Sequence, residues 1–131
     1  MEKITLATRA QTSFIDITEQ ISAFIAKHNF HNGLCYIFIP HTTAAITINE
    51  HADPDVKEDI LRELNKVIPF NDNYQHMEGN AAAHIKASLI GPALTVAVEN
   101  DRLQLGTWQG IFFCEFDGPR TRQIWISLLP L

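Results

Sequence analysis

The chain has 131 residues, which is the length of one ordinary domain and too short for two well-packed cores. Hydrophobic residues make up 46% and charged residues 19%, a composition that excludes an intrinsically disordered protein. Ten Lys and Arg against fifteen Asp and Glu leave a net charge of −5, which excludes a general nucleic-acid binder because phosphate contacts need a basic surface.

The apolar runs and the two cysteines give an expectation for the cellular location of the protein. The longest apolar run, residues 34–39, is too short to span a bilayer, and residues 1–6 contain no signal-peptide core. We therefore expect a cytoplasmic protein with no membrane segment. Cys35 and Cys114 each lie in an apolar stretch, which favours two buried free thiols over a disulfide.

The hydrophobic pattern predicts a series of short strands. Extended segments are predicted over residues 1–17, 34–39, 44–49, 94–98, 103–116 and 123–129. The run at 34–39 is apolar throughout, which is typical of a strand covered on both faces. Gly106 and Gly110 predict a bulge or kink inside the segment at 103–116.

Two or three helices interrupt these strands. The first begins near Thr18 as N-cap and ends before Gly33. The second has the clearest signal, with Asp53 as cap, Pro54 in the first turn and an end before Pro69. Its predicted buried stripe consists of Val56, Ile60, Leu61, Leu64 and Val67. A polar loop follows, and Asn80 is predicted to cap a short third helix over 81–90. Many strands with two to three helices predict an α+β fold on a mixed or antiparallel sheet, in a single domain over 1–131.

Six histidines are the first feature that points to chemistry. His41 directly follows a predicted buried strand, so a rigid element would hold it as a ligand or general base. Thr42 and Thr43 add hydroxyl groups beside it. A histidine that simply ends a strand at the surface is an equally good interpretation.

A second group surrounds the predicted start of the third helix. His76 and Glu78 precede Asn80, and His84 lies one turn inside the helix. A helix N-terminus is a natural anion site, so the segment suits a phosphate, a metal or both. The spacing matches no local metal signature, so the fold would have to assemble His41, His76 and His84 into a zinc-type site. A surface loop with a core histidine is the alternative.

A third group contains Trp108 and Gln109 between two glycines, followed by Arg120 after a proline turn. Trp108 could stack on a flat ring or pack in the core, and Arg120 could bind phosphate. The acidic residues Glu115 and Asp117 read as partners of Arg120 or Arg122 in plain surface ion pairs. Glu50, just before the second helix, is a candidate for orienting a histidine, and an acid near the helix N-terminus with no chemical task is the alternative.

These groups together resemble the secondary thiamine-phosphate synthase family, also called YjbQ-like. The resemblance rests on the segments at 41–45, 48–50, 53–56, 78–80, 83–89, 105–109 and 115–120, and it covers nearly the whole chain. It implies a compact β-sandwich-like α+β fold that associates as a homotrimer. His51 departs from the expected pattern and is not counted as a ligand, and Met77 puts the reach of His76 in doubt.

The resemblance also implies a site near a subunit boundary. His41, His76 and His84 are its metal candidates, with zinc as the expected divalent metal. Catalytic candidates are Glu50, Glu78, Trp108 and Arg120. Candidates for binding phosphate are Thr42, Thr43, Asn80, Gln109 and Arg120.

The family name implies that a pyrimidine diphosphate is joined to a thiazole phosphate with release of pyrophosphate. A metal and an arginine would stabilise the departing charge. The same groups would also serve a metal-dependent phosphate-ester hydrolase. A trimeric protein that binds a phosphorylated metabolite or metal without turnover is the non-enzymatic alternative, and purely structural histidines are the third.

Overall fold

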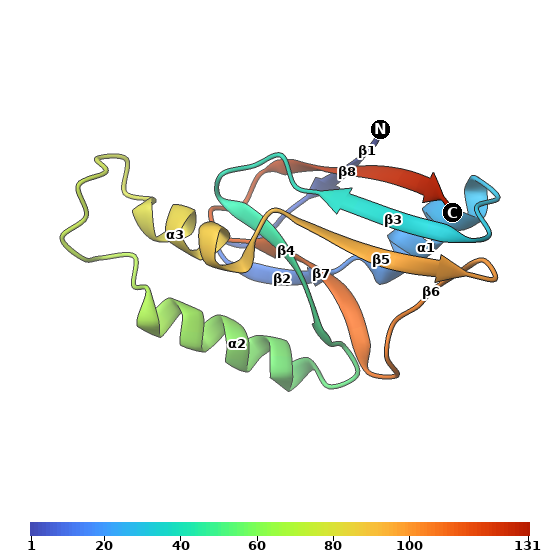
Figure 1. Cartoon of the computed structure of the whole chain (residues 1–131). Coiled ribbons are helices and arrows are strands. Elements are labelled where there is room, and N and C mark those ends of the chain that lie inside the picture. The colour runs from blue at the N-terminus through green and yellow to red at the C-terminus, as the bar shows by residue number, and fades with distance from the viewer.

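The computed structural model describes all 131 residues, and its strands form two sheets with the main core between them (Figure 1). The larger sheet has the order β1 (Glu2–Ala7), β8 (Thr121–Pro130), β3 (Gly33–Phe38), β5 (Ala93–Glu99), β6 (Arg102–Leu103). The smaller sheet has the order β2 (Ser13–Asp16), β7 (Gln109–Glu115), β4 (Ala44–Glu50). Every strand pairing is antiparallel, which confirms the predicted α+β class with a sandwich-like core.

Three helices complete the fold. These are α1 (Thr18–Lys27), α2 (Pro54–Val67) and α3 (Ala81–Ile90). Helix α1 contributes Ile21 and Ile25 to the main core, and Ile17 just before it adds a third isoleucine. Helices α2 and α3 cover the outer face of the smaller sheet. Figure 1 shows no helix over the outer face of the larger sheet. The helices are therefore distributed unequally between the two sheets.

Apolar burial explains this arrangement. Fourteen buried residues from both sheets and α1 form the main core, and β-branched isoleucine dominates it, as expected where strands pack face to face. A second cluster joins the smaller sheet to α3, with Phe14, Phe112 and Phe116 against Ala83 and Ala87. The alanines let α3 lie close to the aromatic rings, so α3 is held firmly at one end of this sheet.

Two predictions of burial are wrong. The β3 residues alternate between buried and half-buried, because the outer face of the larger sheet has no helix over it. In α2 no residue is fully buried, and Val67 is 74% exposed. Ile60, Leu61 and Leu64 do pack against the second cluster. The apolar stripe of α2 leaves this contact only at the last turn of the helix, where Val67 lies.

Helix starts were predicted with mixed success. The Asp53 side chain accepts a hydrogen bond from the Asp55 N–H, which confirms this cap. Thr18 is instead the first residue of α1, and its hydroxyl donates to Asp16 Oδ1. Asn80 occupies the cap position of α3, and its carbonyl accepts from the N–H groups of Ala83 and His84, but its side chain makes no cap hydrogen bond. No bulge lies at Gly110, since β4 and β7 pair residue for residue, but the predicted extended segment is interrupted at residues 104–108, around Gly106.

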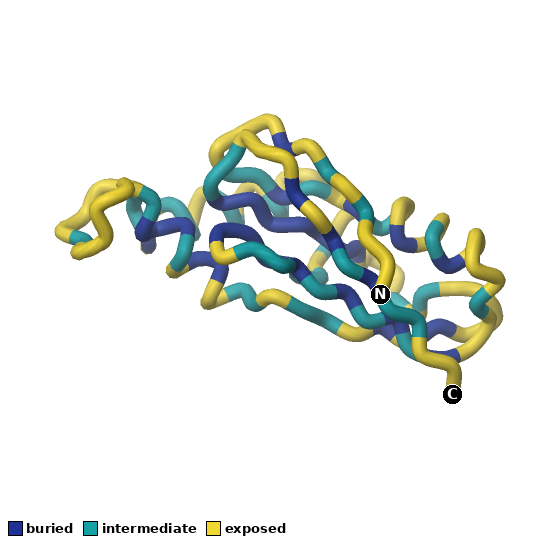
Figure 2. Tube along the Cα trace, turned by 90° about the horizontal axis from the view of Figure 1, so that it is seen from above, coloured by how far each residue is buried: buried dark blue, intermediate teal, exposed yellow.

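The remaining features concern cysteines, membrane segments and the longest connection. Cys35 and Cys114 are buried free thiols, and burial raises the pKa of Cys35 to about 11. No helix is both long and apolar enough to cross a membrane. Residues 68–80 join α2 to α3, and Figure 2 shows this connection projecting from the body of the protein with most of its residues exposed.

Candidate functional site

A pocket of about 460 Å³ lies where the β3–β4 connection meets α3. Its polar lining consists of His41 and Thr42 from the connection, and His84 and Ser88 from the helix. Small apolar residues complete it, namely Ala44, Ala87 and Pro92. The fold thus brings together two of the three predicted histidines and one of the two threonines.

His41 is held in one orientation by the backbone. Its Nε2 accepts a hydrogen bond from the Gln123 N–H at 2.9 Å. In the neutral ring the proton therefore lies on Nδ1, which makes no hydrogen bond within the chain. Burial, followed by the positive charge of Arg122, lowers the pKa of His41. His41 thus offers a neutral N–H donor to the pocket.

The charge beside His41 belongs to a buried ion pair. Arg122 and Glu115 are 3% and 0% exposed, and Arg122 donates to both carboxylate oxygens of Glu115. Burial acts to raise the pKa of Glu115, but hydrogen bonds from Arg122, the Asp117 N–H and Thr8 outweigh it and hold this pKa below its ordinary value. Arg122 also donates to Thr43 Oγ1 at 2.9 Å. The prediction of a plain surface ion pair is wrong for Glu115.

Two consequences follow for the predicted residues. Thr43 is buried and bonded to Arg122, so its hydroxyl is not part of the pocket lining. Arg122 was missed as a site residue, although the sequence carries a signal for it. It shares strand parity with Ile124 and Ile126, and so lies on the inward face of β8.

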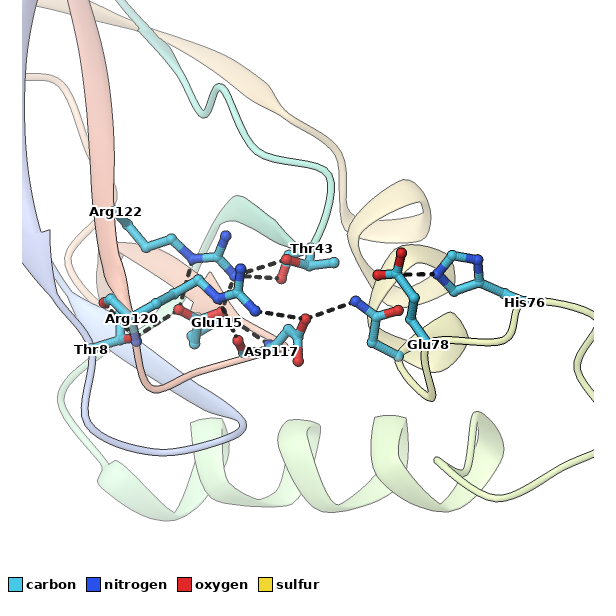
Figure 3. Close-up of polar contacts among 9 residues, drawn as sticks. Thr8, Thr43, His76, Glu78, Glu115, Asp117, Arg120 and Arg122 are labelled. Atoms are coloured by element: carbon cyan, nitrogen blue, oxygen red, sulfur yellow. Dashed lines mark hydrogen bonds and ion pairs between the residues drawn. The ribbon is translucent and has the colours of Figure 1, made fainter.

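A second polar link runs from the β7–β8 turn to the start of α3 (Figure 3). Asp117 Oδ2 accepts hydrogen bonds from Arg120 Nη2 at 3.0 Å and from Asn80 Nδ2 at 2.9 Å. Arg120 Nε also donates to the Asp117 carbonyl, while half of its side chain stays exposed. Asn80 Oδ1 is buried without a hydrogen-bond partner. The Asn80 amide therefore ties the helix start to the turn that carries Arg120.

His76 and Glu78 lie on the exposed connection before α3. The His76 ring meets the His84 ring edge-on, with 5.2 Å between the ring centroids. Glu78 Oε2 is 3.9 Å from His76 Nε2, and both side chains are largely exposed. His84 is thus adjacent to His76 on one side and shares its pocket with His41 on the other.

The three histidines fit a metal ion only in part. Neutral imidazole is a good zinc ligand, and His76 and His84 are close enough to act as a pair. The Nε2 lone pair of His41, however, already accepts the Gln123 N–H. No three His, Cys, Asp or Glu side chains of the chain are grouped in a way that could hold a metal ion.

Three predicted site residues lie at the opposite end of the smaller sheet. Glu50 pairs with Gln109 at one end of β4, whereas Ala44, which lines the pocket, pairs with Glu115 at the other. Seven strand residues span about 20 Å. Glu50, Trp108 and Gln109 therefore do not line the His41 pocket of their own chain. Trp108 is 62% exposed, and Gln109 Oε1 accepts the Gly106 N–H at 2.8 Å.

This far end holds an aspartate–histidine pair that sequence reasoning missed. Asp16 Oδ2 is 2.8 Å from His51 Nδ1, and Asp16 Oδ1 accepts two hydrogen bonds from Thr18. Burial acts to raise the pKa of Asp16, but the hydrogen bonds from Thr18 and His51 outweigh it and lower this pKa. The His51 ring lies directly against Gly110, where a Cβ would come within 2.4 Å of His51 Nδ1.

Comparison with known proteins gives a consistent picture over the whole chain. Residues 2–130 match the family model described as UPF0047 protein YjbQ-like. UPF0047 protein YugU of Bacillus subtilis is 50% identical over 130 residues, or 98% of each chain. UPF0047 protein MJ1081 of Methanocaldococcus jannaschii is 46% identical over 97% of this chain and 92% of its own.

Solved structures of similar proteins share the fold of this chain. A crystal structure of an uncharacterized conserved protein from Clostridium acetobutylicum superposes with a TM-score of 0.96 at 48% identity, covering 98% of this chain and all of the other. A conserved hypothetical protein from Thermus thermophilus gives 0.92 at 40% identity, with 98% and 100% coverage. None of these names assigns an activity.

Proposed function

Because the chain belongs to the YjbQ-like UPF0047 family, we propose that it is a small transferase of the thiamine-phosphate synthase type. It joins a pyrimidine diphosphate to a thiazole phosphate and releases pyrophosphate. The observation that carries this proposal is the pocket in which His41 and His84, from separate parts of the chain, face the same space beside two hydroxyl groups.

The departing diphosphate needs its growing negative charge stabilised more than it needs a strong base. His41 donates its Nδ1–H to a phosphate oxygen, and Thr42 donates its hydroxyl. The Ser88 hydroxyl lines the pocket but already donates to the His84 carbonyl at 2.9 Å. The exposed edge of Arg120, oriented by Asp117, pairs with the same group. Asn80 fixes the helix start next to that arginine, and Glu78 orients His76.

A divalent metal, with zinc as the first candidate, stays part of the proposal. His76 and His84 would hold it, and it would neutralise charge on the leaving phosphate. His41 is expected to act beside the metal rather than on it, because the Gln123 N–H occupies its Nε2.

Metal content per chain, measured on protein purified without a histidine tag, tests this part. We expect near-stoichiometric metal in the wild type and in His41→Ala, and its loss in His84→Ala. Loss in His41→Ala as well would restore the three-histidine site. A wild type that takes up no added zinc would contradict the metal altogether.

We further propose that the protein is a homotrimer in which a second copy completes the site. Glu50, Trp108 and Gln109 lie too far from the pocket of their own chain to serve it. On a neighbouring copy, Trp108 flanks the aromatic ring of the substrate and Glu50 acts as acid or base. The exposure of Trp108 supports this, since a largely exposed tryptophan suits contact with a partner or ligand. The two free thiols fit a cytoplasmic location.

The test is turnover of a pyrimidine diphosphate with a thiazole phosphate, followed by release of pyrophosphate. His84→Ala is expected to lower kcat/KM by about 10²- to 10⁴-fold, the usual scale for removing a group that moves protons or stabilises charge. His31→Ala is the matched control, because His31 is exposed and pairs with Asp101 far along the chain. Phosphate release from one substrate alone would instead support a phosphate-ester hydrolase, and binding without turnover a metabolite-binding protein.

A further inference from the structure

Lys86 is the only lysine that is completely buried, and it has no role in the proposed transfer reaction. It lies on α3 two residues after His84, so the two side chains leave the helix on nearly opposite sides. His84 faces the pocket, and Lys86 faces α2 and the connection at 68–80. Burial lowers the pKa of the ammonium group.

The contacts of the ammonium are few and directional. Lys86 Nζ donates to Asn65 Oδ1 on α2 at 2.6 Å. It also lies 4.3 Å from the ring centroid of Phe70, a cation–π distance. Asn65 is itself held by a hydrogen bond from its amide to Thr12 Oγ1 at 3.2 Å. Lys86 forms no ion pair with any carboxylate.

Stability alone does not explain a lysine here. A buried charge without a carboxylate partner is costly, and an apolar side chain of the same length would fill the space equally well. What the ammonium adds is orientation, because both of its contacts depend on direction. Phe70 is the third residue of the connection that carries His76 and Glu78 to the pocket side of α3.

We infer that Lys86 is a positioning residue that fixes the connection at 68–80 so that His76 stays against His84. Asn65 holds the ammonium from α2, and the ammonium holds the Phe70 ring. The inference rests on the proposed function only in treating His76 as part of the site.

Four variants test it in the full-length protein. Lys86→Met keeps the length and removes the charge, Lys86→Arg keeps a cation, and Phe70→Leu removes the ring. Lys57→Met is the matched control, because Lys57 on α2 also lies over a ring, that of Phe112 at 6.0 Å, away from the connection. Hydrogen exchange of residues 70–79, thermal unfolding, and the nuclear Overhauser effect between the His76 and His84 rings are measured for each variant.

For Lys86→Met we expect an unchanged or raised Tm together with exchange at 70–79 that is at least about tenfold faster. The His76–His84 contact is lost at the same time. Phe70→Leu gives the same local loosening, Lys86→Arg restores wild-type exchange, and Lys57→Met leaves exchange at 70–79 unchanged. A residue that served only the core would lower the Tm and speed exchange throughout the chain.

Two results would overturn the inference. One is wild-type exchange at 70–79 in Lys86→Met, and the other is a global loss of stability in that variant without preferential loosening of the connection. Binding of inorganic pyrophosphate, measured by calorimetry in parallel, separates this inference from the proposed function. No binding by the wild type would contradict the proposed function, while the exchange result would still decide the role of Lys86.

Discussion

A histidine lies at each end of the smaller sheet, and the charged group beside it is a cation at one end and an anion at the other. At one end His41 lies beside the Arg122 guanidinium and accepts a backbone N–H. At the other end His51 lies against the Asp16 carboxylate, which Thr18 anchors. One end forms a pocket with His84, and the other presents an exposed Trp108.

This difference shows that residue type alone does not set what a histidine can do. A neighbouring cation favours the neutral ring, which suits donation of an N–H to a phosphate oxygen. A neighbouring carboxylate orients the ring through Nδ1, and Nε2 of His51 makes no hydrogen bond within the chain. In the proposed function, the pocket end therefore binds the phosphate groups and the far end contacts a neighbouring copy.

The largest expected effect comes from breaking the buried ion pair at the pocket end. Glu115→Ala leaves Arg122 buried without its carboxylate, and we expect a loss of about 3–5 kcal/mol in the free energy of unfolding. Urea unfolding measures it. Arg62→Ala is the control, since its exposed pair with Asp59 at 3.5 Å is worth at most about 1 kcal/mol. A small effect at Glu115 would show that the pair does not support the pocket.

The next prediction joins the two ends. Trp108→Ala is expected to lower turnover by about 10- to 100-fold, the scale of losing one stacked ring, while pyrophosphate binding stays unchanged. If a second copy supplies Trp108, a mixture of Trp108→Ala and His84→Ala subunits forms some sites in which both groups are intact. Random assembly in a ring restores about a quarter of wild-type turnover. No recovery on mixing and reassembly would contradict the shared site.

A third effect is confined to the far end. Gly110→Ala places a new Cβ within 2.7 Å of three atoms of His51. One of these atoms is the Cβ of His51, so a rotation of the His51 ring alone cannot relieve the clash. We expect a loss of about 1–3 kcal/mol and a broken Asp16–His51 contact. Gly106→Ala is the control, because its Cβ would meet only the flexible end of Gln109 at 3.2 Å. Equal stability of the two variants would contradict a tightly held His51.

The smallest effect is a pH dependence of stability from His41. Its pKa in the folded chain lies below the ordinary value of 6.5, so the unfolded chain binds this proton more readily. Acidification below 6.5 therefore lowers the free energy of unfolding, until the pH falls below the folded pKa. The pKa of Glu115, held below its ordinary 4.5, adds a further loss only in more acidic solution. Urea midpoints at about pH 7.5 and about pH 5.5 should differ less in His41→Asn than in the wild type.

Local signals made much of the fold predictable. The Asp53-Pro54 pair marked the start of α2, and alternating apolar residues marked β4 and β8. Errors arose where tertiary contacts decide. Leu34, Tyr36 and Phe38 are half-buried, because the face of β3 that they occupy has no helix over it. The Asn80 side chain donates a hydrogen bond to Asp117, which lies on a turn 37 residues further along the chain. No local sequence pattern indicates this hydrogen bond.

The candidate site was predictable in its residue types and less so in their placement. That His41 and His84 share a pocket depends on α3 packing against β4, which only the folded chain decides. The separation of Glu50 from His41 was easier to predict, since Glu50 is the last residue of a seven-residue strand that begins just after His41. Arg122 could have been found from its parity with Ile124, whereas Lys86 stood in an ordinary helical pattern with nothing to indicate its burial.

The most direct test of the pocket is a titration of isotope-labelled protein with inorganic pyrophosphate. Nuclear magnetic resonance would monitor the chemical shifts of the backbone and of the histidine rings. The account predicts that shifts cluster at residues 41–43 and 80–88 and at the Arg120 side chain, with Asp16 and His51 unchanged. Shifts confined to Asp16, His51 and Trp108, or none at any concentration, would contradict a phosphate-binding site at the His41 end.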